Sequence, residues 1–208
     1  MKVDHIRPQD IENTSMQIIR EELAQMGKEI PAELAPVVMR VIHTTADFEY
    51  ADTMAFSPCA IEKAREAIRS GARIVTDTNM ALAGVNKKAL AKWGGETICF
   101  MADPEVAEEA SARGITRAAV SMERAAALDG PTIFAIGNAP TALLTLRELI
   151  DTKGYKPALI IGVPVGFVNV VNAKEQIMET QIPWIVNRGR KGGSGVAAAI
   201  CNAILYGM

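Results

Sequence analysis

The chain has 208 residues, of which 49% are hydrophobic and 22% charged, and its net charge is −2. The length favours one domain covering residues 1–208, and the near-neutral charge argues against nucleic acid as a partner, because phosphate binding needs a broad basic face. The three cysteines are too scattered for a disulfide framework or a structural zinc site. With no apolar signal core and no membrane-length apolar run, we expect a cytoplasmic protein that is neither secreted nor membrane-spanning.

Three helices are predicted in the first third of the chain. Apolar residues at helical spacing follow the potential capping cluster at residues 13–15 and predict a first helix through Met26. Pro31 suits the first turn of a second helix, which the residues Thr44 and Thr45 close. After a linker through Phe56, a third helix runs from Pro58 to a stop at Gly71.

The rest of the chain alternates short apolar runs with helical patterns. This alternation predicts a doubly wound, mostly parallel five-stranded sheet with helices on both faces, preceded by an N-terminal helical extension. The predicted strands are Ile74-Val75, Thr97–Phe100, Thr132–Ile136, Ala158–Val163 and Trp184–Val186. The predicted helices lie near residues 78–92, 103–127, 139–151, 172–180 and 194–206.

Polar and glycine-rich segments follow four of the predicted strands. In parallel α/β sheets the carboxyl ends of the strands carry the ligand site, and glycines let a ligand approach the backbone. Each loop alone could be an ordinary tight turn, but four loops at one edge favour a site. The segments are Thr76–Asn79, Gly137–Thr141, Gly162–Gly166 and Asn187–Gly195.

Residues 193–198 match the G-x-G-x-x-A dinucleotide pattern between a predicted strand and a predicted helix. The sequence ends at Met208, so no second strand with a ribose-binding acid follows, and we reject a nicotinamide cofactor. The phosphate-binding motif G-x-x-x-x-G-K-[ST] is absent from the sequence as well. A regulatory nucleotide-binding module would require the context that is missing here.

The sequence contains two histidines, and His43 is the candidate for chemistry. His5 lies in a polar N-terminal segment and is most simply solvated. His43 falls off the apolar stripe of the second predicted helix, near its C-terminal end, where the helix dipole favours an imidazolium. A protonated imidazole can act as a general acid near neutral pH; the alternative is an ordinary surface histidine.

Several motifs along nearly the whole chain resemble the precorrin-8X methylmutase family, which includes cobalt-precorrin-8 methylmutases. The resemblance implies a flavodoxin-like fold and an isomerase that moves a methyl group between adjacent ring carbons, from C-11 to C-12, to give hydrogenobyrinic or cobyrinic acid. The motifs, in chain order, are IENTSMQII (11–19), RVIHT (40–44), FSP (56–58), IVTDTNMALAG (74–84), TRAA (116–119), IGNAPTAL (136–143), GVPVGFVN (162–169) and RGRKGGS (188–194).

The resemblance also assigns roles to single residues. His43 falls on the family's catalytic histidine, which protonates the macrocycle, and Ser15 and Arg117 fall on substrate-binding positions. The loop chemistry adds further candidates for contact with the carboxylates of the substrate. These are Thr76, Asp77, Gly137, Asn138, Gly166, Lys191, Gly192 and Ser194. Met80, Val163, Val165 and Phe167 would suit an apolar wall or the core equally well.

The implied partner is a tetrapyrrole, precorrin-8 or cobalt-precorrin-8. The reaction needs no cofactor and no metal bound by the protein, because any cobalt would be carried by the macrocycle. The resemblance implies a homodimer. The alternative function is a non-catalytic corrinoid carrier, which would keep the glycine-rich loops but would not need His43.

Overall fold

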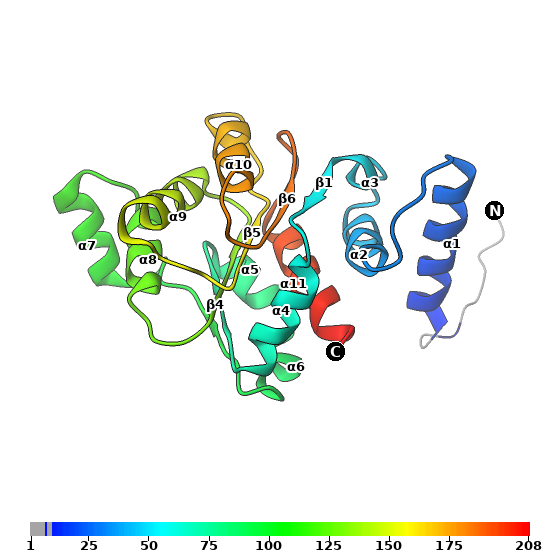
Figure 1. The fold of residues 1–208 in the computed structure, drawn as a ribbon, viewed down its shortest axis with the longest axis horizontal. Coiled ribbons are helices and arrows are strands. Elements are labelled where there is room, and N and C mark those ends of the chain that lie inside the picture. Colours follow the sequence, from blue (N-terminus) through cyan, green and yellow to red (C-terminus); the bar gives the residue numbers. More distant parts are fainter. Residues whose placement is uncertain (1–6, 8–9) are drawn as a thin grey trace.

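The computed structural model describes residue 7 and residues 10–208 and shows one six-stranded sheet between two layers of helices (Figure 1). His5 lies outside the described residues. The strands are β1 (Met54–Phe56), β2 (Arg73–Thr76), β3 (Thr97–Ile98), β4 (Thr132–Ile136), β5 (Leu159–Gly162) and β6 (Trp184–Asn187). The helices are α1 (Ile11–Gln25), α2 (Ala35–Thr45), α3 (Tyr50–Thr53), α4 (Ala60–Arg69), α5 (Asn79–Gly84), α6 (Lys87–Ala91), α7 (Pro104–Arg113), α8 (Arg117–Ala126), α9 (Pro140–Lys153), α10 (Val170–Met178) and α11 (Ser194–Tyr206).

The strands lie in the order β1-β6-β5-β4-β2-β3. The five strands from β2 to β6 are parallel and correspond to the five that the sequence predicts. Taken alone, they follow the doubly wound order 2-1-3-4-5. The order reverses between β2 and β4, so the topological switch point lies between the ends of these two strands.

Strand β1 corrects the predicted linker through Phe56. It pairs antiparallel with β6 at the edge of the sheet, and the hydroxyl of Ser57 accepts a bond from the Trp184 N–H at 2.9 Å. Three residues are too few to show an alternating pattern, so only contact with β6 identifies this segment as a strand. The sheet therefore has six strands, one of them an antiparallel edge strand, whereas a mostly parallel sheet of five strands was predicted.

The two long helices predicted near residues 78–92 and 103–127 are each divided into two helices, α5 and α6 in the first and α7 and α8 in the second. In each, a polar side chain caps the start of the second helix. Asn86 starts α6 by accepting a bond from the Ala89 N–H. Gly114, with φ +64°, ends α7, and Thr116 then caps α8. At the N-terminus, α1 begins at Ile11, before the predicted capping cluster, whose residues lie inside the helix. Pro31 lies in a turn before α2, which begins at Ala35.

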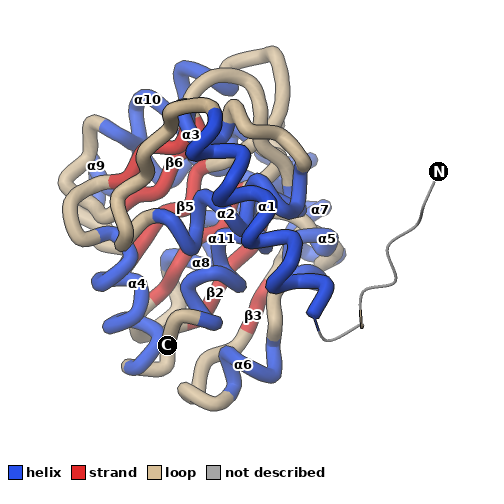
Figure 2. The backbone as a smooth tube through the Cα atoms, turned by 90° about the vertical axis from the view of Figure 1, so that its right-hand side faces the viewer, coloured by secondary structure: helices blue, strands red, loops and turns tan. Residues whose placement is uncertain are grey.

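Alternate residues of the central strands enter different hydrophobic clusters. On β4, Ile133 and Ala135 join the cluster with α2, α4 and α11, whereas Phe134 and Ile136 join the cluster with α8, α9 and α10. Figure 1 shows the strands between these layers, and Figure 2, turned by 90°, looks onto the sheet from the side of α1 and α2. No helix of the described residues combines the length and apolar character that crossing a membrane requires.

Leu143 and Leu144 on α9 test the packing of the helix on the sheet. Leu143 is fully buried and lies against Gly162 of β5, whereas Leu144 is half-buried. Leu143→Ala should lower the free energy of unfolding by about 2–5 kcal/mol, because it removes buried methyl groups and leaves a cavity. Leu144→Ala, the matched control, should cost clearly less in urea unfolding. Equal losses would contradict this account of the core.

Candidate active site

His43 lies in the last turn of α2 with its side chain exposed. The neighbouring Val41 and Ile42 are buried against α11 and the sheet. The helix ends at Ala46, which has a left-handed conformation (φ 53°) and donates its N–H to the Ile42 carbonyl. The predicted position of His43, on the outer face near the helix C-terminus, is confirmed.

A hollow of ≈ 200 Å³ between α1 and α2 brings Ser15 and His43 together. The Ser15 hydroxyl donates to the Ile11 carbonyl at 2.9 Å. Glu22 lines the same hollow, and the sequence analysis did not select it. The sequence could have indicated Glu22, because it lies seven residues after Ser15, which is about two helical turns and therefore on the same face of the helix. The hollow thus joins a hydroxyl, an imidazole and a carboxylate.

The carboxyl edge of the sheet lies beside the end of α2. A Cβ on Gly195, at the start of α11, would lie 3.9 Å from the Thr44 methyl group. Next to it, the hydroxyls of Ser194 and Thr78 are 2.8 Å apart. His43 and the 187–195 loop therefore face one region of the molecule.

Asp77 occupies the switch point between β2 and β4 with no exposed surface. Its carboxylate accepts hydrogen bonds from the backbone N–H groups of Gly137 (2.9 Å), Asn138 (2.8 Å) and Ala139 (2.6 Å). Burial raises the pKa of Asp77, and these three N–H groups oppose the rise. The carboxylate is thus committed to holding the β4–α9 loop.

Thr76 is also fully buried, and its hydroxyl donates to the Thr78 carbonyl at 2.9 Å. The structure therefore corrects the prediction of direct ligand contact by Thr76 and Asp77, because neither side chain reaches the surface. Both support loops instead. Asn138, whose side chain is exposed, stays a candidate for contact.

The glycines of these loops allow close approach of backbone to backbone. A Cβ on Gly137 would come within 2.7 Å of Ser194, and one on Gly192 would lie 2.1 Å from the Val163 carbonyl oxygen. Gly166, with φ +153°, donates its N–H to the Arg190 carbonyl at 3.1 Å. The glycines thus join loops that follow three different strands.

Lys191 is tied to the segment after α2. Its ammonium contacts Asp47 and lies 2.8 Å from Glu49, and the contact lowers the pKa of Asp47. This link fixes the 187–195 loop beside His43. The sequence analysis selected Lys191 but not its two carboxylate partners.

Arg117 begins α8, on the opposite face of the sheet from α2 (Figure 1). Its guanidinium lies 3.5 Å from the Met101 carbonyl, and the neighbouring Thr116 contacts Thr141 at the start of α9. Arg117 thus flanks the same carboxyl edge from the other side. A ligand touching both His43 and Arg117 has to extend over that edge.

Apolar side chains are exposed at the carboxyl edge. Met80 is 74% exposed and Phe167 82% exposed, and Val165 is partly exposed. The Arg190 guanidinium lies over the Phe167 ring, 5.4 Å from its centroid. Val163 is fully buried, so of the two alternatives left open for it the structure supports core packing.

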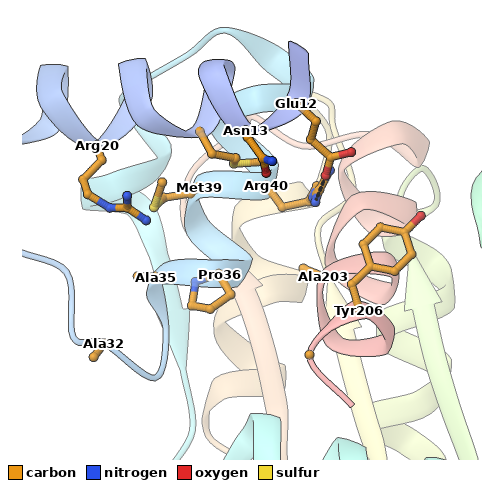
Figure 3. Close-up of a pocket in the computed structure, with 12 residues that line it drawn as sticks. Glu12, Asn13, Arg20, Ala32, Ala35, Pro36, Met39, Arg40, Ala203 and Tyr206 are labelled. Carbon is orange, nitrogen blue, oxygen red and sulfur yellow. Dashed lines mark hydrogen bonds and ion pairs between the residues drawn. The ribbon is translucent and has the colours of Figure 1, made fainter. Parts of the chain in front are cut away.

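A larger hollow of ≈ 590 Å³ lies between α1, α2 and α11 (Figure 3), and it shares no lining residue with the hollow of Ser15 and His43. Arg40 crosses it, paired with Glu12 and positioned over the Tyr206 ring at 5.3 Å. Arg20 points into the same space. None of the predicted contact residues lines this hollow. Within residue 7 and residues 10–208, no three His, Cys, Asp or Glu side chains form a metal site.

Comparison with known proteins gives full-length matches. The family model described as precorrin-8X methylmutase matches residues 10–207. A cobalt-precorrin-8 methylmutase from Priestia megaterium is 46% identical, over 96% of this chain and 88% of the relative. A precorrin-8X methylmutase from Pseudomonas aeruginosa is 39% identical, over 97% of both. The solved precorrin-8X methyl mutase from Thermus thermophilus is 43% identical with a TM-score of 0.86, covering 95% of each chain.

Asp77→Asn tests the hold on the β4–α9 loop. An amide presents one acceptor oxygen and turns its NH₂ group toward N–H donors, so at least one buried bond is lost. The free energy of unfolding should fall by about 1–3 kcal/mol, measured by urea denaturation. Asp129→Asn, at an exposed aspartate, is the control and should change little. A fully stable Asp77→Asn chain would show that the carboxylate is dispensable.

Proposed function

The chain belongs to the precorrin-8X methylmutase family and is an isomerase of cobalamin biosynthesis, and we propose that it moves a methyl group from C-11 to C-12 of (cobalt-)precorrin-8 by acid catalysis through His43. The product is hydrogenobyrinic acid, or cobyrinic acid when cobalt is present. The observation that carries the residue assignment is the shared hollow of Ser15 and His43, two residues from separate helices.

His43 supplies the proton in this proposal. The exposed imidazole stands at the C-terminal end of α2 and lines the same hollow as Ser15. Protonation makes the macrocycle electron-poor at the carbon that receives the methyl group. The C-11–methyl bond then breaks as the C-12–methyl bond forms, with the methyl group keeping its bonding electron pair, and the proton returns to His43 afterwards. Glu22 in the same hollow would orient or stabilise the imidazolium.

The tetrapyrrole would lie across the carboxyl edge, between His43 and Arg117. Exposed Met80 and Phe167 offer contact to the apolar ring. Arg190 suits its carboxylates, whereas the Lys191 ammonium is already paired with Asp47 and Glu49. Asn138, Gly166, Gly192 and Ser194 remain proposed contacts through their backbone or short side chains. The prediction for Gly137 is corrected, because this residue is buried and its N–H is bound to Asp77.

We place the active enzyme as a homodimer in the cytoplasm. Helix α1 packs chiefly on α2 and exposes Ile11, Ile18 and Met26, which a second copy would cover. The three cysteines are unpaired in the structure, as in a reducing compartment. The proposed substrate is precorrin-8 or its cobalt form, because relatives named for cobalt-precorrin-8 and for precorrin-8X both match this chain at 39% identity or more. No cofactor takes part in the proposed reaction.

His43→Ala should fold and bind product but lose about 10²–10⁴-fold in kcat, the usual contribution of a general acid. The assay follows the corrin absorption spectrum after mixing with cobalt-precorrin-8 and, separately, precorrin-8. Added imidazole should restore part of the rate. Near-native turnover by His43→Ala would contradict the assignment of His43 as the general acid. Binding of substrate without conversion by the native chain would favour the corrinoid carrier.

Ser15→Ala should weaken substrate binding with little change in kcat. Loss of one hydrogen bond predicts a rise in KM of roughly five- to tenfold. Gln17→Ala is the matched control, because Gln17 lies on the exposed face of α1 and its amide donates to Glu21 of the same helix. Unchanged KM in Ser15→Ala would remove Ser15 from the site.

A further inference from the structure

The carbonyl groups of residues 188–191, in the 188–193 loop, turn toward the protein. Four consecutive carbonyl oxygens, those of residues 188–191, accept hydrogen bonds. The Asn187 amide donates to Arg188 (3.2 Å) and Lys191 (3.0 Å), the Lys174 ammonium donates to Gly189 and Lys191 (2.8 Å each), and the Gly166 N–H donates to Arg190 (3.1 Å).

Lys174 is the buried centre of this arrangement. It lies on α10 with 1% of its surface exposed, and the two loop carbonyls are its hydrogen-bond partners. Burial lowers its pKa to about 8. A buried ammonium is costly unless it is hydrogen-bonded, and neither the core nor the proposed proton transfer requires one here. A role in shaping the loop accounts for its presence.

Peptide geometry determines the direction of the backbone N–H groups in this loop. In a trans peptide the N–H points opposite to the carbonyl of the same unit, and the chain has no cis peptide bond among its described residues. The N–H groups of residues 189–192 therefore point away from the protein body. None of the four has an acceptor within the part of the chain that the structure describes.

The side chains of the same loop add positive charge. Arg188 and Arg190 are exposed, and Arg190 lies over Phe167. Successive outward N–H groups form a concave surface that binds anions. The loop thus combines backbone donors and guanidinium groups on one surface beside the His43 hollow.

We propose that Lys174 is a positioning residue that turns the N–H groups of residues 189–192 outward to bind a carboxylate of the tetrapyrrole. This inference rests on the proposed function for the identity of the ligand. Lys174 does not touch the substrate. It acts by holding the carbonyl oxygens of the loop inward, so that the opposite edge of each peptide is available.

Lys174→Met removes both hydrogen bonds while nearly preserving side-chain volume. KM and the Kd for hydrogenobyrinic acid should rise about tenfold or more, while kcat stays within about threefold because His43 is untouched. Glu175→Met, at an exposed neighbour on α10, is the control and should change neither. A fall in kcat with unchanged KM would overturn the proposal.

Binding of a fully amidated product separates carboxylate recognition from general loop damage. The native chain should bind the acid more tightly than the amide, and Lys174→Met should lose most of that preference. An unchanged preference would contradict the proposal. This comparison requires no turnover, so failure of the native chain to convert substrate would reject the proposed function independently.

Amide NMR of the native chain tests the proposal without a variant, so its outcome does not depend on whether a variant folds. Adding hydrogenobyrinic acid should move the Arg190 and Gly192 amide proton signals downfield, and adding the amidated product should move them less. Static signals at saturation would show that the loop donors remain bound to water and would overturn the carboxylate site.

Discussion

The carboxylate of Asp77 determines where a ligand can sit. Doubly wound sheets usually bind ligands in the crevice at the switch point of strand order. Here that crevice is occupied by the Asp77 carboxylate and by the three backbone N–H groups that donate hydrogen bonds to it. Ser194 closes over Gly137 from the other side. With the crevice filled, binding moves outward, to the loops and helix ends that flank the edge.

Two buried ionisable groups of opposite sign organise those loops. Asp77 draws the N–H groups of the β4–α9 loop inward, whereas Lys174 draws in the carbonyl groups of the 188–193 loop. The β4–α9 loop is thereby closed against the sheet, whereas the backbone N–H groups of the 188–193 loop face outward. A polycarboxylate would meet a basic, donor-rich surface next to the α1–α2 hollow, where the proton donor stands.

The sequence predicted the parallel strands, the helix layers and the position of His43, because those features depend on local periodicity. It did not predict β1, which is three residues long and exists through pairing with β6. It selected Asp77 for its loop position but not its burial, since contacts across 60 residues leave no local pattern. Lys174 was missed for the same reason: a lysine in an amphipathic helix gives no sign that its ammonium is buried.

The most direct test of this account is a crystal structure of the native chain with hydrogenobyrinic acid. The account predicts the ring over the carboxyl edge, within hydrogen-bond reach of His43, with one carboxylate on the N–H groups of residues 189–192. A ring bound instead in the hollow between α1, α2 and α11, with the 188–193 loop in contact only with water, would contradict it.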